Sequence, residues 1–126
     1  MSPDDLLDVP AFLEPGSATI DDFERLDLRV GRVLAAEPLA GARQPAYKLR
    51  LDFGSAGERG SSARLTETYP DPSVLVRRLV VAVVNFPPRR VAGFRSEVLV
   101  LGALADGGET PLLGLDEGAQ PGQRIG

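Results

Sequence analysis

Two uncharged runs rich in β-branched residues, with a rigid basic segment between them, constrain the fold of this chain most. The runs are Leu-Val-Val-Ala-Val-Val at 79–84 and Val-Leu-Val-Leu at 98–101, and each has the length of a buried strand. Between them lies Asn-Phe-Pro-Pro-Arg-Arg at 85–90. Because its prolines fix φ and lack N–H groups, this segment cannot continue a sheet and holds its arginines outward. The pattern predicts two core strands joined by a preorganised cationic loop, which favours an anionic partner.

The composition predicts one globular domain and removes several kinds of chemistry. The 126 residues are 43% hydrophobic, which suits a chain that buries roughly two thirds of its unfolded surface. The absence of cysteine excludes disulfides, zinc–thiolate sites and thiol nucleophiles. The absence of histidine removes the usual general base near pH 7 and most transition-metal sites. The adjacent carboxylates, such as Asp21–Asp22 and Asp116–Glu117, lie in local polar runs. We therefore expect no catalytic residues, no metal and no cofactor.

Residues 1–18 are predicted to be an acidic arm that precedes a domain at 19–126. A turn of helix could form at 2–7, but Pro10 and Pro15 interrupt anything longer, so we expect the arm to be flexible. The chain has no run of about 18 apolar residues, and its N-terminus is acidic where a signal peptide would be basic. We expect a cytoplasmic protein without membrane insertion.

The net charge of −4 conceals two segments of opposite sign. Residues 1–27 contain eight acidic residues and one basic residue, whereas residues 28–126 contain ten acidic and thirteen basic residues. Their net charges are therefore −7 and +3. Thirteen of the fourteen basic residues are arginine, which binds phosphate through two parallel hydrogen bonds and stacks on bases. Genomic composition explains this arginine usage equally well, because the chain is also rich in alanine, glycine and proline.

Alternation of apolar and polar residues marks two further strands. In residues 26–33 the alternation changes phase at Gly31, which predicts a bulged or bent strand. Residues 47–53 alternate cleanly, and Lys48 and Arg50 then lie on the outward face.

A third strand, at 62–66, repeats this alternation with Ser62 and Arg64 outward. The glycine-rich segment 54–60 should connect it to the preceding strand as a hairpin.

The remaining elements complete an all-β fold. A capping box predicts a helix at 19–25, Asp and Pro predict a second at 71–78, and residues 111–115 are predicted to form a final strand. Five or six short strands with a helix between the third and fourth favour a five-stranded oligonucleotide/oligosaccharide-binding (OB) barrel, with a two-sheet sandwich as the alternative.

Several segments resemble, in order, the tRNA-binding domain family. The matching segments are FERLDLRVGRVLAAEP, ARQPAYKL, LDFG, SSA, NFPPRRVAGFRSEVLVLG and the closing PGQRIG. The resemblance covers Phe23–Gly126 and is nearest to the free-standing bacterial branch, the CsaA proteins. Synthetase-type relatives have Gly-Met after Ser-Glu, whereas this chain has Val98-Leu99, which favours that branch.

The resemblance implies an OB fold, a homodimer, and recognition of tRNA by backbone and shape. In family members the positions matching Asn85, Arg89, Arg90 and Ser96 lie on the RNA face. The matches and the basic strand face give the candidate RNA-binding residues Asn85, Arg89, Arg90, Ser96, Glu97, Ser62, Arg64, Lys48 and Arg50. A solvated strand face is the alternative for each charged residue, and Glu97 could instead pair with Arg89 or Arg95.

CsaA-like relatives are also described as export-related chaperones, which implies a second function. An apolar groove lined by Phe86, Pro87, Pro88 and Phe94 could bind unfolded or presecretory polypeptides. The two aromatic rings could instead stack on exposed bases or plug the mouth of the barrel.

The uniform apolar runs give separate support for the homodimer, because both faces of such strands must be covered. A partner subunit or the helix at 19–25 could cover the outer face.

Overall fold

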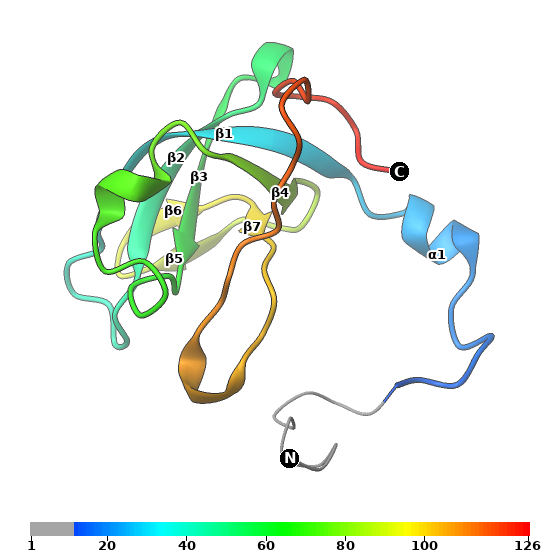
Figure 1. Ribbon diagram of the computed structural model, residues 1–126, viewed down its shortest axis with the longest axis horizontal. Helices are drawn as coiled ribbons and strands as arrows, with labels where there is room; N and C mark the ends of the chain where they lie inside the picture. The colour runs from blue at the N-terminus through cyan, green and yellow to red at the C-terminus, as the bar shows by residue number, and fades with distance from the viewer. Residues whose placement is uncertain (1–11) are drawn as a thin grey trace.

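The computed structural model describes residues 12–126, and the helical turn expected at 2–7 lies outside them (Figure 1). The structure consists mostly of strands with a few short helices. The strands are β1 (Leu28–Pro38), β2 (Tyr47–Asp52), β3 (Glu58–Ala63), β4 (Leu79–Val83), β5 (Arg89–Val91), β6 (Phe94–Ser96) and β7 (Leu99–Val100). The helices are α1 (Ile20–Glu24) and the 3-10 helices η2 (Gly54–Ala56), η3 (Pro72–Leu75) and η4 (Asp106–Gly108).

Five of the strands form a nearly closed antiparallel barrel. Their order is β3-β2-β1-β4-β7, and β5 and β6 form a separate two-stranded hairpin. At the open side the residue after β6 approaches β3, where the Glu97 N–H donates to the Gly60 carbonyl over 2.9 Å. The OB-like barrel predicted from the sequence is therefore confirmed, and the two-sheet sandwich that was its alternative is wrong.

The barrel interior is filled by large apolar side chains from every side. Leu49, Leu51 and Phe53 from β2 and its end are at most 1% exposed, and Leu75 from η3 is fully buried. A Cβ at Gly31 would lie 2.8 Å from the Phe53 ring, so glycine is required for this close approach.

The bulge in β1 lies beyond that glycine. The register with β2 shifts between Val33 and Ala35, a few residues later than the predicted bend at Gly31. The glycine therefore reflects packing under the Phe53 ring, not the bulge itself.

Both faces of β4 are covered within the chain. Val80 and Ala82 face the barrel interior, whereas Val81 and Val83 pack outside it with Leu28. The outer cluster is completed by the partly buried residues Leu26, Leu101, Leu115 and Ile125. The C-terminal segment is held there by backbone hydrogen bonds, including one from Ile125 N–H to the Leu28 carbonyl.

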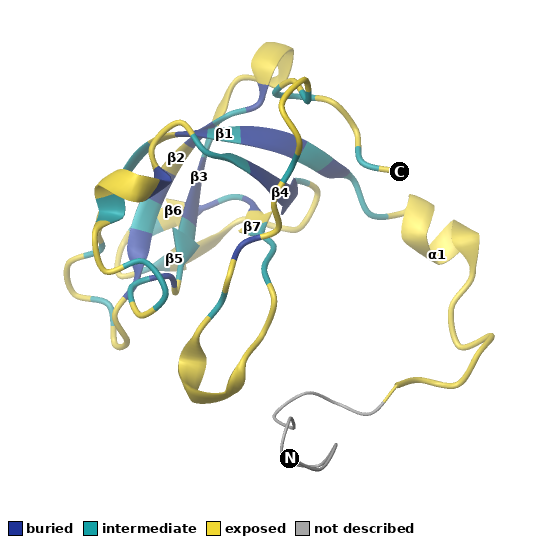
Figure 2. Cartoon of the chain, in the orientation of Figure 1, coloured by how far each residue is buried: buried dark blue, intermediate teal, exposed yellow. Residues whose placement is uncertain are grey.

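This arrangement corrects the expectation that a partner or the N-terminal helix covers the outer face. Helix α1 contributes nothing to it, because all of its residues are exposed, and the helix extends away from the barrel (Figures 1 and 2). The capping box that predicted this helix is present, with Thr19 and Asp22 bonded reciprocally.

Several other predicted elements are shorter than expected. The helix predicted at 71–78 is the single turn η3, although its Asp71 cap and Pro72 are as predicted. The expected final strand at 111–115 is reduced to one bridge between Leu112 and Gly102. Within residues 12–126, no helix is both long and apolar enough to span a bilayer.

Candidate nucleic-acid interface

The β5–β6 hairpin carries the paired arginines that the sequence placed in a loop. Arg89 and Arg90 lie on β5, which pairs with β6, so the prediction that the whole segment 85–90 stays out of a sheet is wrong. The turn consists of Ala92 and Gly93, whose φ values of 49° and 80° fit the tight hairpin turn that matches strand twist. The hairpin could not be predicted from the sequence, because its turn requires a positive φ at Ala92 and alanine seldom adopts that conformation. Of the segment 85–90, only residues 85–88 form a loop, because Arg89 and Arg90 belong to β5.

A groove of about 310 Å³ lies beside the hairpin and gathers many of the predicted residues. Its lining comes from the 85–88 loop, β3, β5, β6 and β7. The lining residues are Ser62, Phe86, Pro87, Arg89, Ser96, Glu97, Val98 and Leu99. The groove therefore combines one guanidinium, one carboxylate and two hydroxyls with an apolar wall.

The two serines of the groove join the hairpin to the barrel. The Ser62 N–H donates to Ser96 Oγ over 3.0 Å, and the two Oγ atoms lie 3.3 Å apart within hydrogen-bonding distance. Ser96 is only 6% exposed. It therefore fixes the position of β6 against β3, and Ser62 is the more accessible hydroxyl.

Glu97 pairs with an arginine that the sequence did not suggest. Its Oε2 lies 3.9 Å from Arg59 Nε, whereas the sequence pointed to neighbours such as Arg89 or Arg95. Its Oε1 accepts from the Gly60 N–H over 3.3 Å. The carboxylate thus holds the edge of β3 and leaves Arg89 uncompensated.

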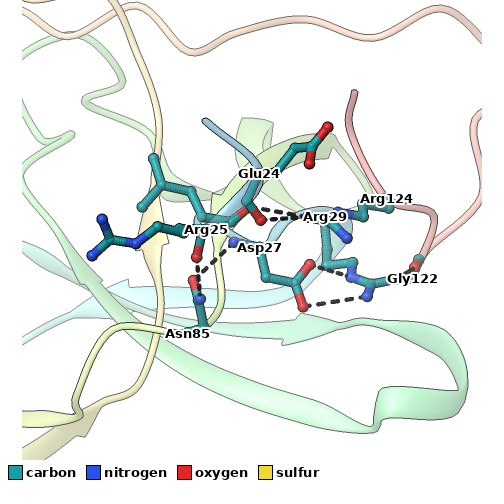
Figure 3. Close-up of polar contacts among 8 residues, drawn as sticks. Glu24, Arg25, Asp27, Arg29, Asn85, Gly122 and Arg124 are labelled. Atoms are coloured by element: carbon teal, nitrogen blue, oxygen red, sulfur yellow. Dashed lines mark hydrogen bonds and ion pairs between the residues drawn. The ribbon is translucent and has the colours of Figure 1, made fainter. Parts of the chain in front are cut away.

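Asn85 is engaged with the N-terminal linker. Its Oδ1 accepts from the Asp27 N–H and its Nδ2 donates to the Arg25 carbonyl, each over 2.9 Å (Figure 3). Because both ends of the amide are used, Asn85 anchors the 85–88 loop to the segment between α1 and β1. It lines a second hollow, of about 350 Å³, with Asp22 of α1, with Arg25 and Leu26 of that segment, and with Phe86, which also lines the first groove.

The strand-face cations differ in how much charge they leave free. Lys48 Nζ lies 3.9 Å from Glu37 Oε1, and Arg50 Nη2 lies 2.9 Å from Glu58 Oε1, so each of these cations is paired with a carboxylate. Arg64 is exposed and makes no ion pair with residues 12–126.

The hairpin itself carries three exposed guanidinium groups. Arg90 and Arg95 are direct cross-strand partners, and Arg89 lies opposite Ser96. Arg90 donates to the Gly93 carbonyl over 2.9 Å, and none of the three arginines forms an ion pair with the described residues. Arg95 was missing from the sequence candidates, although a hairpin register, once known, places it beside Arg90.

The aromatic residues have different surroundings. Phe86 is 43% exposed in the groove. Phe94 is partly buried and lies over β3, where a Cβ at Gly60 would come within 2.8 Å of its ring. Phe86 is thus open to a ligand, whereas Phe94 packs the hairpin onto the barrel.

Comparisons with known proteins agree with this architecture. The family described as "Putative tRNA binding domain" matches residues 28–124. The solved structure of chaperone CsaA from Bacillus anthracis is 47% identical, with a TM-score of 0.82 over 88% of this chain and 100% of that one. The CsaA chaperone protein from Picrophilus torridus is 41% identical, with a TM-score of 0.77 over 86% of this chain and 99% of that one.

A curated relative is a much larger enzyme. The methionine–tRNA ligase of Xanthomonas campestris is 40% identical over 111 residues, which are 88% of this chain and 16% of the ligase. This chain therefore spans about a sixth of the length of the curated relatives that it matches. The resemblance inferred from the sequence is confirmed, and the chain belongs to the tRNA-binding domain family.

Proposed function

We propose that this chain is a non-catalytic protein that binds tRNA through the β5–β6 hairpin and its groove. The observation that carries the proposal is a hairpin with three exposed, unneutralised arginines. Arg89 lines the groove together with the Ser62 hydroxyl, whereas Arg90 and Arg95 lie on the other face of the hairpin. Membership of the tRNA-binding domain family supports RNA as the anion. The catalytic activity of the ligases belongs to enzymes that are about six times longer.

Backbone and shape are the features that this surface can recognise. Arginines that neutralise phosphates release counterions, so the affinity should fall steeply as salt rises, with a log–log slope of about −0.7 to −0.9 per phosphate. The groove offers few groups for base edges, since Ser96 and Glu97 already bond to β3. Stacking of an unpaired base on Phe86 would add about 1–3 kcal/mol.

A double substitution tests the proposal. Arg89→Ala with Arg90→Ala should weaken tRNA binding about 10- to 100-fold and reduce the steepness of the log–log salt slope by about 1.5, because two phosphate contacts are lost. Fluorescence anisotropy with a labelled tRNA transcript measures both quantities. The melting temperature should change little, since both side chains are exposed.

The matched control is Arg89→Lys with Arg90→Lys, which keeps both charges and should retain most of the affinity. If the double alanine variant binds tRNA as tightly as the parent, the hairpin is not the RNA surface.

A homodimer and a cytoplasmic location are part of the proposal. Helix α1 supports self-association, because Ile20 and Phe23 are 71% and 40% exposed in the single chain. Cytoplasm is where a tRNA-binding protein meets its ligand. Light scattering of the parent and of Ile20→Asp with Phe23→Asp tests the interface, and a parent that is monomeric at micromolar concentration would contradict the homodimer.

Binding of unfolded or presecretory polypeptides is the second candidate function. It is favoured by the apolar wall of the groove, formed by Phe86, Pro87, Val98 and Leu99. Of the other residues that the sequence suggested for this role, Pro88 is exposed and Phe94 is partly buried. Suppression of the aggregation of an unfolding client protein tests this function, and no protection at one dimer per client would contradict it.

A further inference from the structure

Arg32, Arg77 and Arg78 lie close together outside the groove, where the chain passes from η3 into β4. The Arg77 N–H donates to the Val33 carbonyl over 2.7 Å, and the Val33 N–H donates to the Arg78 carbonyl over 2.9 Å. Arg32, next to Val33 on β1, donates from Nη1 to the Arg77 carbonyl over 2.8 Å. These backbone contacts hold the three residues in one neighbourhood.

Arg77 occupies a backbone conformation that its side chain disfavours. Its φ is 75°, in the left-handed region where a bulky side chain crowds the main chain and glycine does not. The side chain is exposed and makes no hydrogen bond or ion pair with residues 12–126. The contacts within the described chain do not use this guanidinium group, which leaves it available to a ligand.

The other two guanidinium groups are held in place without being neutralised. Arg32 bonds to a carbonyl, and Arg78 stacks on the Tyr69 ring at 5.3 Å from its centroid. The cross-strand neighbour of Arg32 is Asp52, whose carboxylate accepts from the Gly54 N–H. Within the described chain, neither arginine forms an ion pair.

We propose that Arg32, Arg77 and Arg78 form a second phosphate-binding surface, which contacts the backbone of the same RNA as the hairpin. The inference rests on the proposed function. Arg32 lies on β1, which is two strands away from β3 in the sheet, and the hairpin packs on β3. Two cationic surfaces on one barrel can bind different parts of one RNA backbone, and neither needs to read its sequence.

Neutral residues that tolerate the left-handed region provide the test in the full chain. Arg77→Gly and Arg77→Asn should keep or raise the melting temperature, because strain is relieved, yet weaken binding of a labelled tRNA transcript about three- to tenfold. The log–log salt slope should become less steep by about 0.7–0.9, which corresponds to one phosphate. Arg77→Lys keeps the charge at the same backbone position and should bind nearly as well as the parent.

The outcomes separate this inference from the proposed function. If both neutral Arg77 variants bind tRNA with the affinity and salt slope of the parent while Arg89→Ala with Arg90→Ala loses binding, the second surface is refuted and the hairpin stands. If the Arg77 variants lose binding and the hairpin variant does not, the second surface stands and the proposed hairpin site is refuted.

Discussion

Arg90 and Arg95 lie directly opposite each other on the β5–β6 hairpin. Like charges in this position destabilise an antiparallel pair, and a hairpin with three residues in each strand has little stability to spare. A phosphate placed between the two guanidinium groups would remove the repulsion. The unfavourable pair is therefore expected of a surface that binds an anion.

Arg95→Glu should change stability and binding in opposite directions. It replaces the repulsion by a cross-strand ion pair with Arg90, so the free energy of unfolding should rise by about 0.5 kcal/mol. The affinity for tRNA should fall at least tenfold, because the hairpin loses a positive charge and gains a negative one. Urea unfolding and anisotropy measure the two effects.

The neutral variant Arg95→Gln is the matched control and should lie between the parent and Arg95→Glu in both measurements. Unchanged or tighter tRNA binding by Arg95→Glu would show that the hairpin charge does not contribute to the interface.

Asn85 shows what could not be predicted from the sequence at the scale of single residues. The family pattern placed it on the RNA face. Its amide group, however, forms hydrogen bonds with the backbone of Asp27 and Arg25, which lie 58 and 60 positions earlier in the chain. Such bonds depend on where the N-terminal linker passes the barrel, which no local pattern encodes. Ser96 is similar, since the family pattern placed it on the RNA face and did not indicate its bond to Ser62.

The start of η3 is stabilised by a local cap whose strength depends on pH. The Ser73 hydroxyl and the Ser73 N–H both donate to the Asp71 carboxylate, and they lower the pKa of Asp71 from its ordinary value of 3.8. Because the folded-state pKa is lowered, the cap contributes its full stability above pH 3.8 and loses it as the pH falls through the folded-state value.

Ser73→Ala should return the pKa of Asp71 part of the way toward its ordinary value, since the backbone bond remains. The stability difference between parent and variant should be larger at pH 7 than at pH 2.5. Carboxyl NMR titration and unfolding at the two pH values measure these effects. An unchanged pKa, or an equal stability difference at both pH values, would contradict the assigned cap.

The elements that were predicted correctly are those whose formation depends on neighbouring residues in the sequence. The clean alternation at 47–53 became β2, and the capping box became α1. The β5–β6 hairpin was missed because Ala92 replaces the asparagine or aspartate that usually marks such a turn. The prediction of a strand at 111–115 was wrong for a different reason. Its apolar residues pack on the barrel, but the segment forms only one β-bridge with another part of the chain.

At the scale of the whole molecule, the barrel covers both faces of β4 and leaves the hairpin, where we propose the binding surface, exposed. The C-terminal segment buries the outer face of β4, so the first apolar run is explained within one chain. Any dimer therefore depends on other surfaces, of which α1 is the most apolar candidate described above. Unpaired arginines lie on the hairpin and beside η3, where their charge is available to an anionic ligand.

Hydrogen exchange of the backbone amides, with and without a saturating tRNA transcript, tests the central claim most directly. The proposed interface predicts slower exchange in residues 86–99, which include the hairpin and the wall of the groove. Exchange should remain unchanged in the exposed loop at 103–109, which lies outside both proposed surfaces. Saturated binding without any protection between residues 86 and 99 would contradict the proposed tRNA interface.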